Sequence, residues 1–408
     1  MSITSLQLIL AVVAYGKLVA LIFFFGLEAV GSVSYITALV TLLSIVSQLY
    51  NNQGVQVSYI RSKPRLAHMY KEAMNQLSLY TGIIAICILL LINILGLIII
   101  PLEYLPIIGA AIMAATQNGA YDFQCTVNNR VDTYLKSQIY GSVFFLGFAL
   151  LIRNFDINIK HLIVLYPIQV FASFIYYKLE FRGQSSGTHY SFRNSSVKAY
   201  IALQKKHSTL NAIPVTSVTC DYIIKSLFIT ASGPVLVGLL QIIQSIDSLI
   251  GNIFAGPIYK KAIYDYTHHR YLSIDPRFIL YIKRLAFPIL LISVPLILVK
   301  AFDISDYYTY AKQLKLVNDY IWIFIVFLIS KYFTLVWGLI GQILLSGSRG
   351  KAVVCGEIGS KIISTLLTIL FFVYVTDDIY AYIYSYSISS ILLLYYSIVQ
   401  LAKYKNSI

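Results

Sequence analysis

The sequence predicts an all-α polytopic membrane protein with about twelve transmembrane helices. Of its 408 residues, 58% are hydrophobic and only 12% are charged, whereas a soluble domain averages about 25% charged residues. Apolar runs of about 20 residues, long enough to cross a bilayer as helices, recur along the whole chain. The net charge of +14 is concentrated in alternate connecting segments, which is typical of cytoplasmic loops. It therefore does not indicate binding of nucleic acid.

Charged or turn-forming stretches separate the expected helices. The seventh helix contains enough polar residues to be missed by a hydropathy scan, and the fifth and sixth are short. Residues 256–278 are too polar to span, and we expect an amphipathic connector at the membrane surface. The expected spans are 6–25, 33–58, 76–100, 105–127, 138–153, 160–178, 208–229, 233–255, 279–300, 320–345, 352–375 and 379–401.

The distribution of loop charge predicts that both termini are cytoplasmic. With the N-terminus inside, most of the 31 Lys and Arg residues fall in inner segments, as the positive-inside rule requires. The longest hydrophilic segment then lies inside and separates six spans from six, the layout of an internally repeated transporter. The expected domains are an N-terminal six-helix lobe (1–180), a basic cytoplasmic linker (181–207) and a C-terminal six-helix lobe (208–408).

Several charged side chains fall inside the expected spans. A lysine at the centre of a membrane helix costs roughly 2.5–3.5 kcal/mol on the insertion scale, so such residues normally face a protein interior or a hydrated cavity. Lys17 and Lys331 lie near the middle of their spans, without an acidic partner on the same helix. Asp122 and Asp247 lie nearer the inner ends of their helices, where we expect interfacial solvation.

The other in-span charges occur as acid–base pairs. Asp221 precedes Lys225, and Glu357 precedes Lys361, by four residues, which is the favourable order for a salt bridge within one helix. Each pair could therefore either neutralise itself or line a polar interior. Lys225 is also close enough to its helix end to reach the interface.

Three stretches carry a resemblance to a known family. "GLEAVGSVSYITALVTLLSIVSQLYNNQGVQVSYIRS" resembles the second-helix signature of polysaccharide flippases, with Gly31, Tyr35, Gly54 and Arg61 at the matching positions. "CDYIIKSLFITASGPVLVGLLQIIQSIDSLIGNIFAGPIYKKAI" resembles the seventh and eighth helices, where Asp221 matches a frequent acidic residue. "ILLSGSRGKAVVCGEIGSKI" resembles the turn between helices ten and eleven. The chain is thus similar to Wzx-type O-antigen or capsule repeat-unit flippases of the multidrug/oligosaccharidyl-lipid/polysaccharide (MATE-like) exporter superfamily.

The resemblance implies a function and a set of roles. Such a flippase moves undecaprenyl-diphosphate-linked oligosaccharide across the bacterial inner membrane, driven by protons or Na+, without cofactor, metal site or catalytic residue. Membrane lipids, a polysaccharide polymerase and a chain-length regulator are the implied partners. A lipid diphosphate needs a cationic, hydrated path, which makes the in-span lysines its candidate ligands. The substrate-binding candidates are Lys17, Lys225, Lys331 and Lys361, and the ion-coupling candidates are Asp221 and Glu357.

Two alternative functions stay open, and so does the cargo, because a lipid-linked peptidoglycan precursor or a teichoic-type cargo fits the same charges. An O-antigen polymerase is also polytopic, but it would carry a large periplasmic loop, whereas the longest loop here is expected inside. A MATE-type exporter of cationic drugs would favour acidic rather than lysine-bearing spans.

Two short motifs do not indicate a binding site. "GSRGK" (347–351) lacks the spacing of a phosphate-binding loop, and the pair at His268 and His269 has no partner at ligand spacing.

Overall fold

The computed structural model describes most of the expected helices and forms two units by contact, Met1–Lys225 and Ser226–Ile408. Each unit is described by itself. The described residues are 3–48, 80, 82–94, 101–127, 130–155, 159–182, 198, 208–255, 258–259, 276–301, 321–346, 350–376 and 378–405. The expected linker (181–207) and connector (256–278) lie almost wholly outside these ranges.

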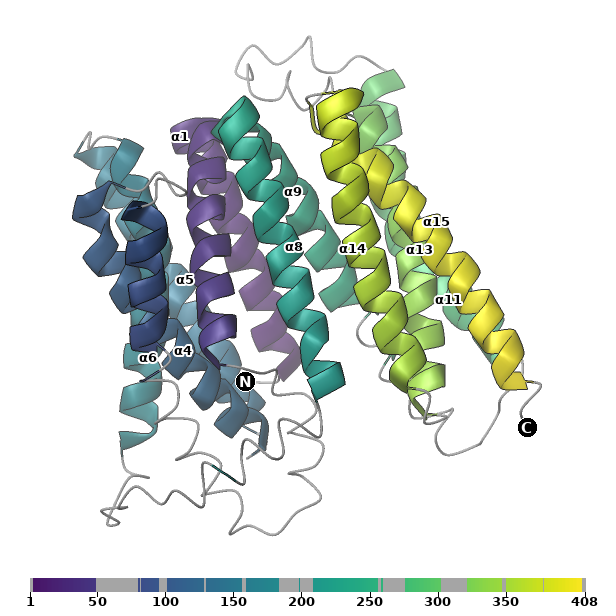
Figure 1. The fold of residues 1–408 in the computed structure, drawn as a ribbon, viewed down its shortest axis with the longest axis horizontal. Coiled ribbons are helices and arrows are strands. Elements are labelled where there is room, and N and C mark those ends of the chain that lie inside the picture. Colours follow the sequence, from purple (N-terminus) through teal and green to yellow (C-terminus); the bar gives the residue numbers. More distant parts are fainter. Residues whose placement is uncertain are drawn as a thin grey trace. The chain divides into compact units, whose positions relative to one another are not determined.

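The first unit is a bundle of helices (Figure 1) with an apolar core. In it, α5 packs against both α1 and α6, and α4 packs against the same two helices. The core includes Val30, Val33, Phe145 and Ala149, from α1 and α5. The elements are α1 (Ile3–Gln48), a helix at Gly82–Ile94, η1 (Leu102–Tyr104), α4 (Leu105–Val127), α5 (Val131–Asn154), η2 (Ile159–Val164), α6 (Leu165–Glu180) and most of α8 (Ser208–Ser232).

The second unit is built around α13. In an apolar stretch of α13, 61% of the residues are buried, against 33% for α14 and 28% for α15. α13 is therefore the inner helix of this unit. It packs against α15, α11 and α14. The elements of this unit are α9 (Pro234–Leu249), a π-helical stretch η4 (Ile250–Ala255), α11 (Pro276–Ala301), α13 (Ile321–Ser346), α14 (Gly350–Tyr374) and α15 (Tyr380–Lys405).

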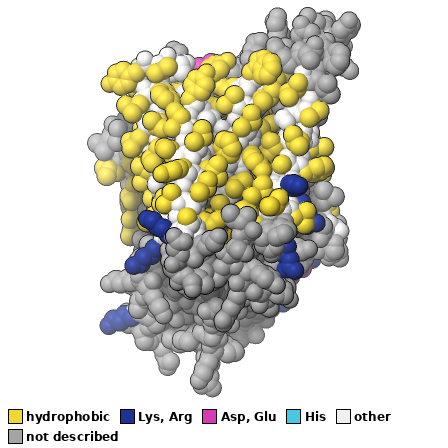
Figure 2. All heavy atoms as spheres, turned by 90° about the vertical axis from the view of Figure 1, so that its right-hand side faces the viewer, with side chains coloured by type: hydrophobic (Ala, Val, Ile, Leu, Met, Phe, Trp, Pro, Cys, Tyr) yellow, Lys and Arg dark blue, Asp and Glu magenta, His cyan; other side chains and the backbone are white. Residues whose placement is uncertain are grey.

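The outer surface of the second unit is suited to lipid. Figure 2 shows a broad face of hydrophobic side chains with Lys and Arg gathered toward one end. Phe287, Leu366 and Tyr395 are more than half exposed on α11, α14 and α15. A contiguous apolar surface of this extent marks contact with a membrane or a partner. Of these three helices, α14 and α15 are long and apolar enough to cross a bilayer.

The helical predictions are confirmed in position. Each of the twelve expected spans overlaps a helix among the described residues. Seven stretches of these residues are long and apolar enough to cross a membrane, which makes the chain a multi-pass membrane protein. The predicted start of the fifth span was wrong, because α5 begins at Val131 rather than at 138. Its first turns carry an exposed ion pair between Asp132 and Lys136, 3.2 Å long, so charge there ends the apolar run but not the helix.

Two glycines form the same backbone turn, one in each unit. Gly26 joins the two arms of α1 with φ 83° and ψ −179°, and Gly233 separates α8 from α9 with φ 84° and ψ −179°. This region of φ/ψ space is essentially restricted to glycine. Buried residues follow both glycines at the same distances, so the two units share this local geometry. The corresponding pairs are Val30 and Val237, Val33 and Leu240, and Ile36 and Ile243.

Replacing Gly233 by alanine is expected to destabilise the protein by about 1–3 kcal/mol, the cost of holding a side-chain-bearing residue in this conformation. A Cβ at this position meets no atom within 4 Å, so the effect is backbone strain alone. The measurement is the thermal unfolding midpoint of the purified protein in detergent. Gly359→Ala is the matched control, because Gly359 lies within α14 and also has open space around its Cα. Equal midpoints for the two variants would contradict the assignment.

Candidate functional site

Lys17 is held by two neighbouring helices of the first unit. Its Nζ donates a hydrogen bond to Oε1 of Gln169 on α6, with a distance of 2.9 Å. The same Nζ lies 5.3 Å from the centre of the Phe145 ring on α5. Both partners are neutral, and a cation over an aromatic face gains about 0.5–2 kcal/mol. Neither of these two contacts supplies an opposite charge to the Lys17 ammonium group.

Asp221 and Lys225 form the expected salt bridge within α8. Nζ of Lys225 lies 3.0 Å from Oδ2 of Asp221, and the two side chains are 5% and 28% exposed. The Lys225 ammonium group therefore lies inside the protein rather than at an interface. The ring of Tyr222 stacks on that of Tyr35 at 5.8 Å and 24°, and their hydroxyl oxygens are 3.3 Å apart. This stack joins the pair's helix to α1.

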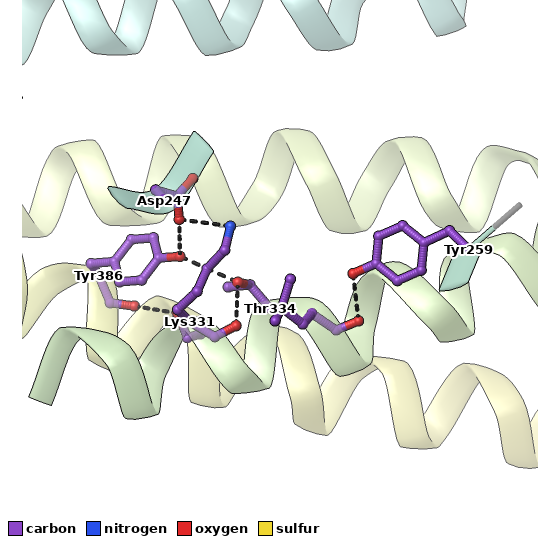
Figure 3. A network of polar contacts seen from close by, with 7 residues as sticks. Asp247, Tyr259, Lys331, Thr334 and Tyr386 are labelled. Carbon is purple, nitrogen blue, oxygen red and sulfur yellow. Dashed lines mark hydrogen bonds and ion pairs between the residues drawn. The ribbon is translucent and has the colours of Figure 1, made fainter. Parts of the chain in front are cut away.

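Lys331 has a partner that the spacing did not predict. Its Nζ lies 2.6 Å from Oδ1 of Asp247 on α9, with side-chain exposures of 11% for Lys331 and 37% for Asp247. The hydroxyl of Tyr386 on α15 donates to the same Oδ1 at 3.4 Å, and lies 3.2 Å from Oγ1 of Thr334. Figure 3 shows these groups converging from three helices. The expectation of simple interfacial solvation for Asp247 is corrected, because its carboxylate joins an interhelical ion pair.

The second expected acid–base pair is not formed. Among the residues that the structure describes, no ion pair joins Glu357 to Lys361. Oε1 of Glu357 instead accepts a hydrogen bond from Nε1 of Trp337, 2.7 Å long, and Lys361 is exposed. Gly356 leaves room for the indole, since a Cβ there would lie 2.6 Å from Cζ2 of Trp337. Tertiary packing of the tryptophan thus redirects the carboxylate.

Asp122 is also engaged inside its unit. Its Oδ1 accepts a hydrogen bond from the hydroxyl of Tyr177 on α6. The Tyr121 ring stacks on Tyr177 at 5.3 Å and on Phe181 at 5.5 Å, and the Arg130 guanidinium lies 5.7 Å from the centre of the Phe181 ring. Interfacial solvation of Asp122 is therefore only part of its environment. This aromatic cluster ties α4 to α6.

The four candidate lysines have separate environments. Lys17 and Lys225 belong to the first unit and Lys331 and Lys361 to the second. The functional neighbours that the sequence left unpredicted are Gln169, Phe145, Trp337 and Tyr386, which lie on other helices than the groups they contact. No pattern along their own helices indicated these four contacts. Within the described ranges, no three His, Cys, Asp or Glu side chains gather as metal ligands.

The fold is similar to that of solved transporter structures. A lipid II flippase MurJ in an inward closed conformation superposes with a TM-score of 0.76 at 12% identity, over 98% of this chain and 87% of that one. An inward-facing multidrug resistance MATE family transporter of the MOP superfamily gives 0.69 at 13% identity, over 97% and 95%. The chain has the MATE-like fold.

A third similar structure is a MOP superfamily transporter from Pyrococcus furiosus, described as having a binding pocket of reverse polarity. It gives a TM-score of 0.53 at 13% identity and covers 98% of this chain and 92% of that one. The sequence matches no protein-family model and no curated protein sequence. At these identities the comparisons establish the MATE-like fold, and the chemistry has to be argued from the residues.

Proposed function

We propose that the protein is a flippase that carries an undecaprenyl-diphosphate-linked oligosaccharide, an O-antigen or capsule repeat unit, across the bacterial inner membrane by alternating access. Its MATE-like fold is shared with a lipid II flippase, a protein that moves a lipid-linked cargo. The fold is also shared with a MATE transporter. The charge of the cargo distinguishes a flippase for a lipid diphosphate from an exporter of cationic drugs.

Lys17 is the observation that carries the proposal. A diphosphate brings concentrated negative charge into a region where unpaired charge is costly, so its path needs cations that are not already neutralised. Lys17 contacts an amide and an aromatic ring at membrane depth. A flexible ammonium group is suited to a transient phosphate contact. A carrier for cationic drugs would gain nothing from such a group.

The remaining roles follow from charge and are part of the same proposal. Lys225, Lys331 and Lys361 contact the phosphates at successive stages, and Asp221 and Glu357 exchange protons or Na+. The N-terminal lobe (1–180) and C-terminal lobe (208–408) move against each other about the cytoplasmic linker (181–207), with both termini inside. A polysaccharide polymerase and a chain-length regulator act on the delivered repeat unit.

The test is lipid transport by the purified full chain in proteoliposomes. A fluorescent undecaprenyl-diphosphate oligosaccharide is incorporated, and the fraction that an impermeant quencher reaches is followed over time. We expect accelerated exposure of the diphosphate lipid compared with protein-free vesicles. Quenching at the protein-free rate, together with uptake of a cationic dye, would replace the flippase by a drug exporter.

A further inference from the structure

We propose that Lys331 and Asp247 form an exchange site, at which an incoming phosphate group replaces the Asp247 carboxylate on Lys331 while Asp247 takes up a proton. This inference rests on the proposed function and names the ligand chemistry and the proton acceptor within it. It also places a proton acceptor at a position other than Asp221 and Glu357.

The pair joins two helices, and this sets it apart from the other membrane-depth pair. Asp247 lies on α9 and Lys331 on α13. Asp221 and Lys225 lie one turn apart on α8, so a rigid movement of helices leaves their distance unchanged. Only the interhelical pair can open and close as helices shift.

Burial is unequal within the pair, and this gives the exchange its direction. The Lys331 side chain is 11% exposed and Asp247 is 37% exposed. Leaving a buried charge without its partner is strongly destabilising. Lys331 therefore keeps one anion beside it at all times, while the more accessible carboxylate can leave.

Tyr386 and Thr334 provide a place for the added proton. In the ion pair the Tyr386 hydroxyl donates to Oδ1 of Asp247. A hydroxyl can equally accept, so a protonated Asp247 can donate to Tyr386. Tyr386 then directs its own hydrogen to Oγ1 of Thr334, 3.2 Å away. Each group would thus keep a hydrogen bond in both states, of which Figure 3 shows the one with the ion pair closed.

Charge balances across the exchange. Before it, one ammonium faces one carboxylate. After it, the ammonium faces a phosphate oxygen and the carboxyl group is neutral. The carboxylate takes the proton from the buffered solvent, the buffer acid becomes its conjugate base, and no covalent bond to carbon or phosphorus changes. By linkage, uptake of a proton on binding means that the anion binds more tightly as the pH falls.

The titratable and charged groups around the Lys331–Asp247 pair are hydrogen-bonded elsewhere, stacked or exposed. We therefore assign the proton uptake to Asp247. On α15, Tyr382 stacks on Tyr386 at 6.0 Å. Burial, followed by the charges of Glu357 and Asp247, raises the pKa of Tyr259. Its hydroxyl donates a hydrogen bond to the Leu335 carbonyl at 2.8 Å. Glu357 on α14 is hydrogen-bonded to Trp337. The basic residues of α11, Lys283 and Arg284, are exposed.

The experiment is a calorimetric titration of the purified full chain with inorganic diphosphate, carried out in two buffers of different ionisation enthalpy. The buffer dependence gives the protons taken up per bound anion. Asp247→Asn keeps the size and hydrogen bonding of the side chain and subtracts the protonation of the diphosphate itself. We expect wild type to take up about one proton more than Asp247→Asn, the number that a single carboxylate can bind.

Two further variants sharpen the result. Asp132→Asn removes an exposed carboxylate paired with Lys136 and should match wild type. Tyr386→Phe removes the proton's acceptor and should shift the pH at which the extra uptake occurs. Equal uptake by wild type and Asp247→Asn, loss of uptake in Asp221→Asn instead, or absence of diphosphate binding would each overturn the inference.

The outcomes separate this inference from the proposed function. Vesicles that move the lipid, with a protein that binds diphosphate without proton uptake by Asp247, keep the flippase and reject the exchange site. Proton-linked binding of diphosphate without lipid movement keeps the exchange site and rejects the flippase.

Discussion

Replacing Asp247 by leucine is expected to lower the free energy of unfolding by about 3–5 kcal/mol, because Lys331 would keep a buried charge without its partner. The measurement is thermal unfolding in detergent, followed by tryptophan fluorescence. Trp337 is a suitable reporter, since it is 2% exposed within α13.

A double variant separates stability from transport. Asp247→Leu with Lys331→Met replaces the ion pair by apolar side chains, an exchange that is often neutral or stabilising inside proteins. We expect the double variant to regain most of the stability lost in Asp247→Leu, but not to transport the lipid. Asp132→Leu, which breaks an exposed pair, should change stability by less than about 1 kcal/mol. A single Asp247→Leu variant as stable as wild type would show that the pair is not buried as described.

Replacing Lys17 by methionine is expected to slow transport of the diphosphate lipid by about tenfold to a hundredfold. Hydrogen bonds to charged groups contribute about 1.5–3 kcal/mol, and each 1.4 kcal/mol corresponds to a tenfold change. Methionine keeps a similar length but cannot hold a phosphate oxygen. The initial rate of exposure of the fluorescent lipid in proteoliposomes is the measurement.

Stability provides the control for Lys17. Its partners Gln169 and Phe145 are neutral, so Lys17→Met leaves no opposite charge without a partner there, and the unfolding midpoint should stay close to that of wild type. Lys136→Met, at an exposed position, should transport at the wild-type rate. If Lys17→Met lost stability and transport together, Lys17 would be a structural residue rather than a ligand.

The positions of the helices were predictable because the bilayer sets a length of about 20 apolar residues. Helix ends were less predictable, as α5 shows. Its first turns are helical but carry charged residues, so the apolar run that predicts the span begins later than the helix. The Gly26 and Gly233 turns carry no hydropathy signal, although the two φ/ψ values agree to within a degree.

The candidate site was predictable only in part. In-span lysines stand out by their cost in a membrane, and the spacing rule was right for Asp221 and Lys225. The same rule was wrong for Glu357, because Trp337 on the neighbouring helix offers it an indole N–H. Spacing along one helix shows which side chains can meet, and the neighbouring helices decide which do.

The sequence by itself determined an all-helical membrane protein, the place of its spans, and the presence of charges that hydrocarbon does not tolerate. Only the tertiary structure decided which groups those charges contact: an amide and a ring for Lys17, the Asp247 carboxylate for Lys331, an indole for Glu357. The physical reason is that transfer to a membrane depends on the composition of each segment, whereas an ion pair or hydrogen bond needs two groups within a few ångströms. Helices distant in sequence supply the second group.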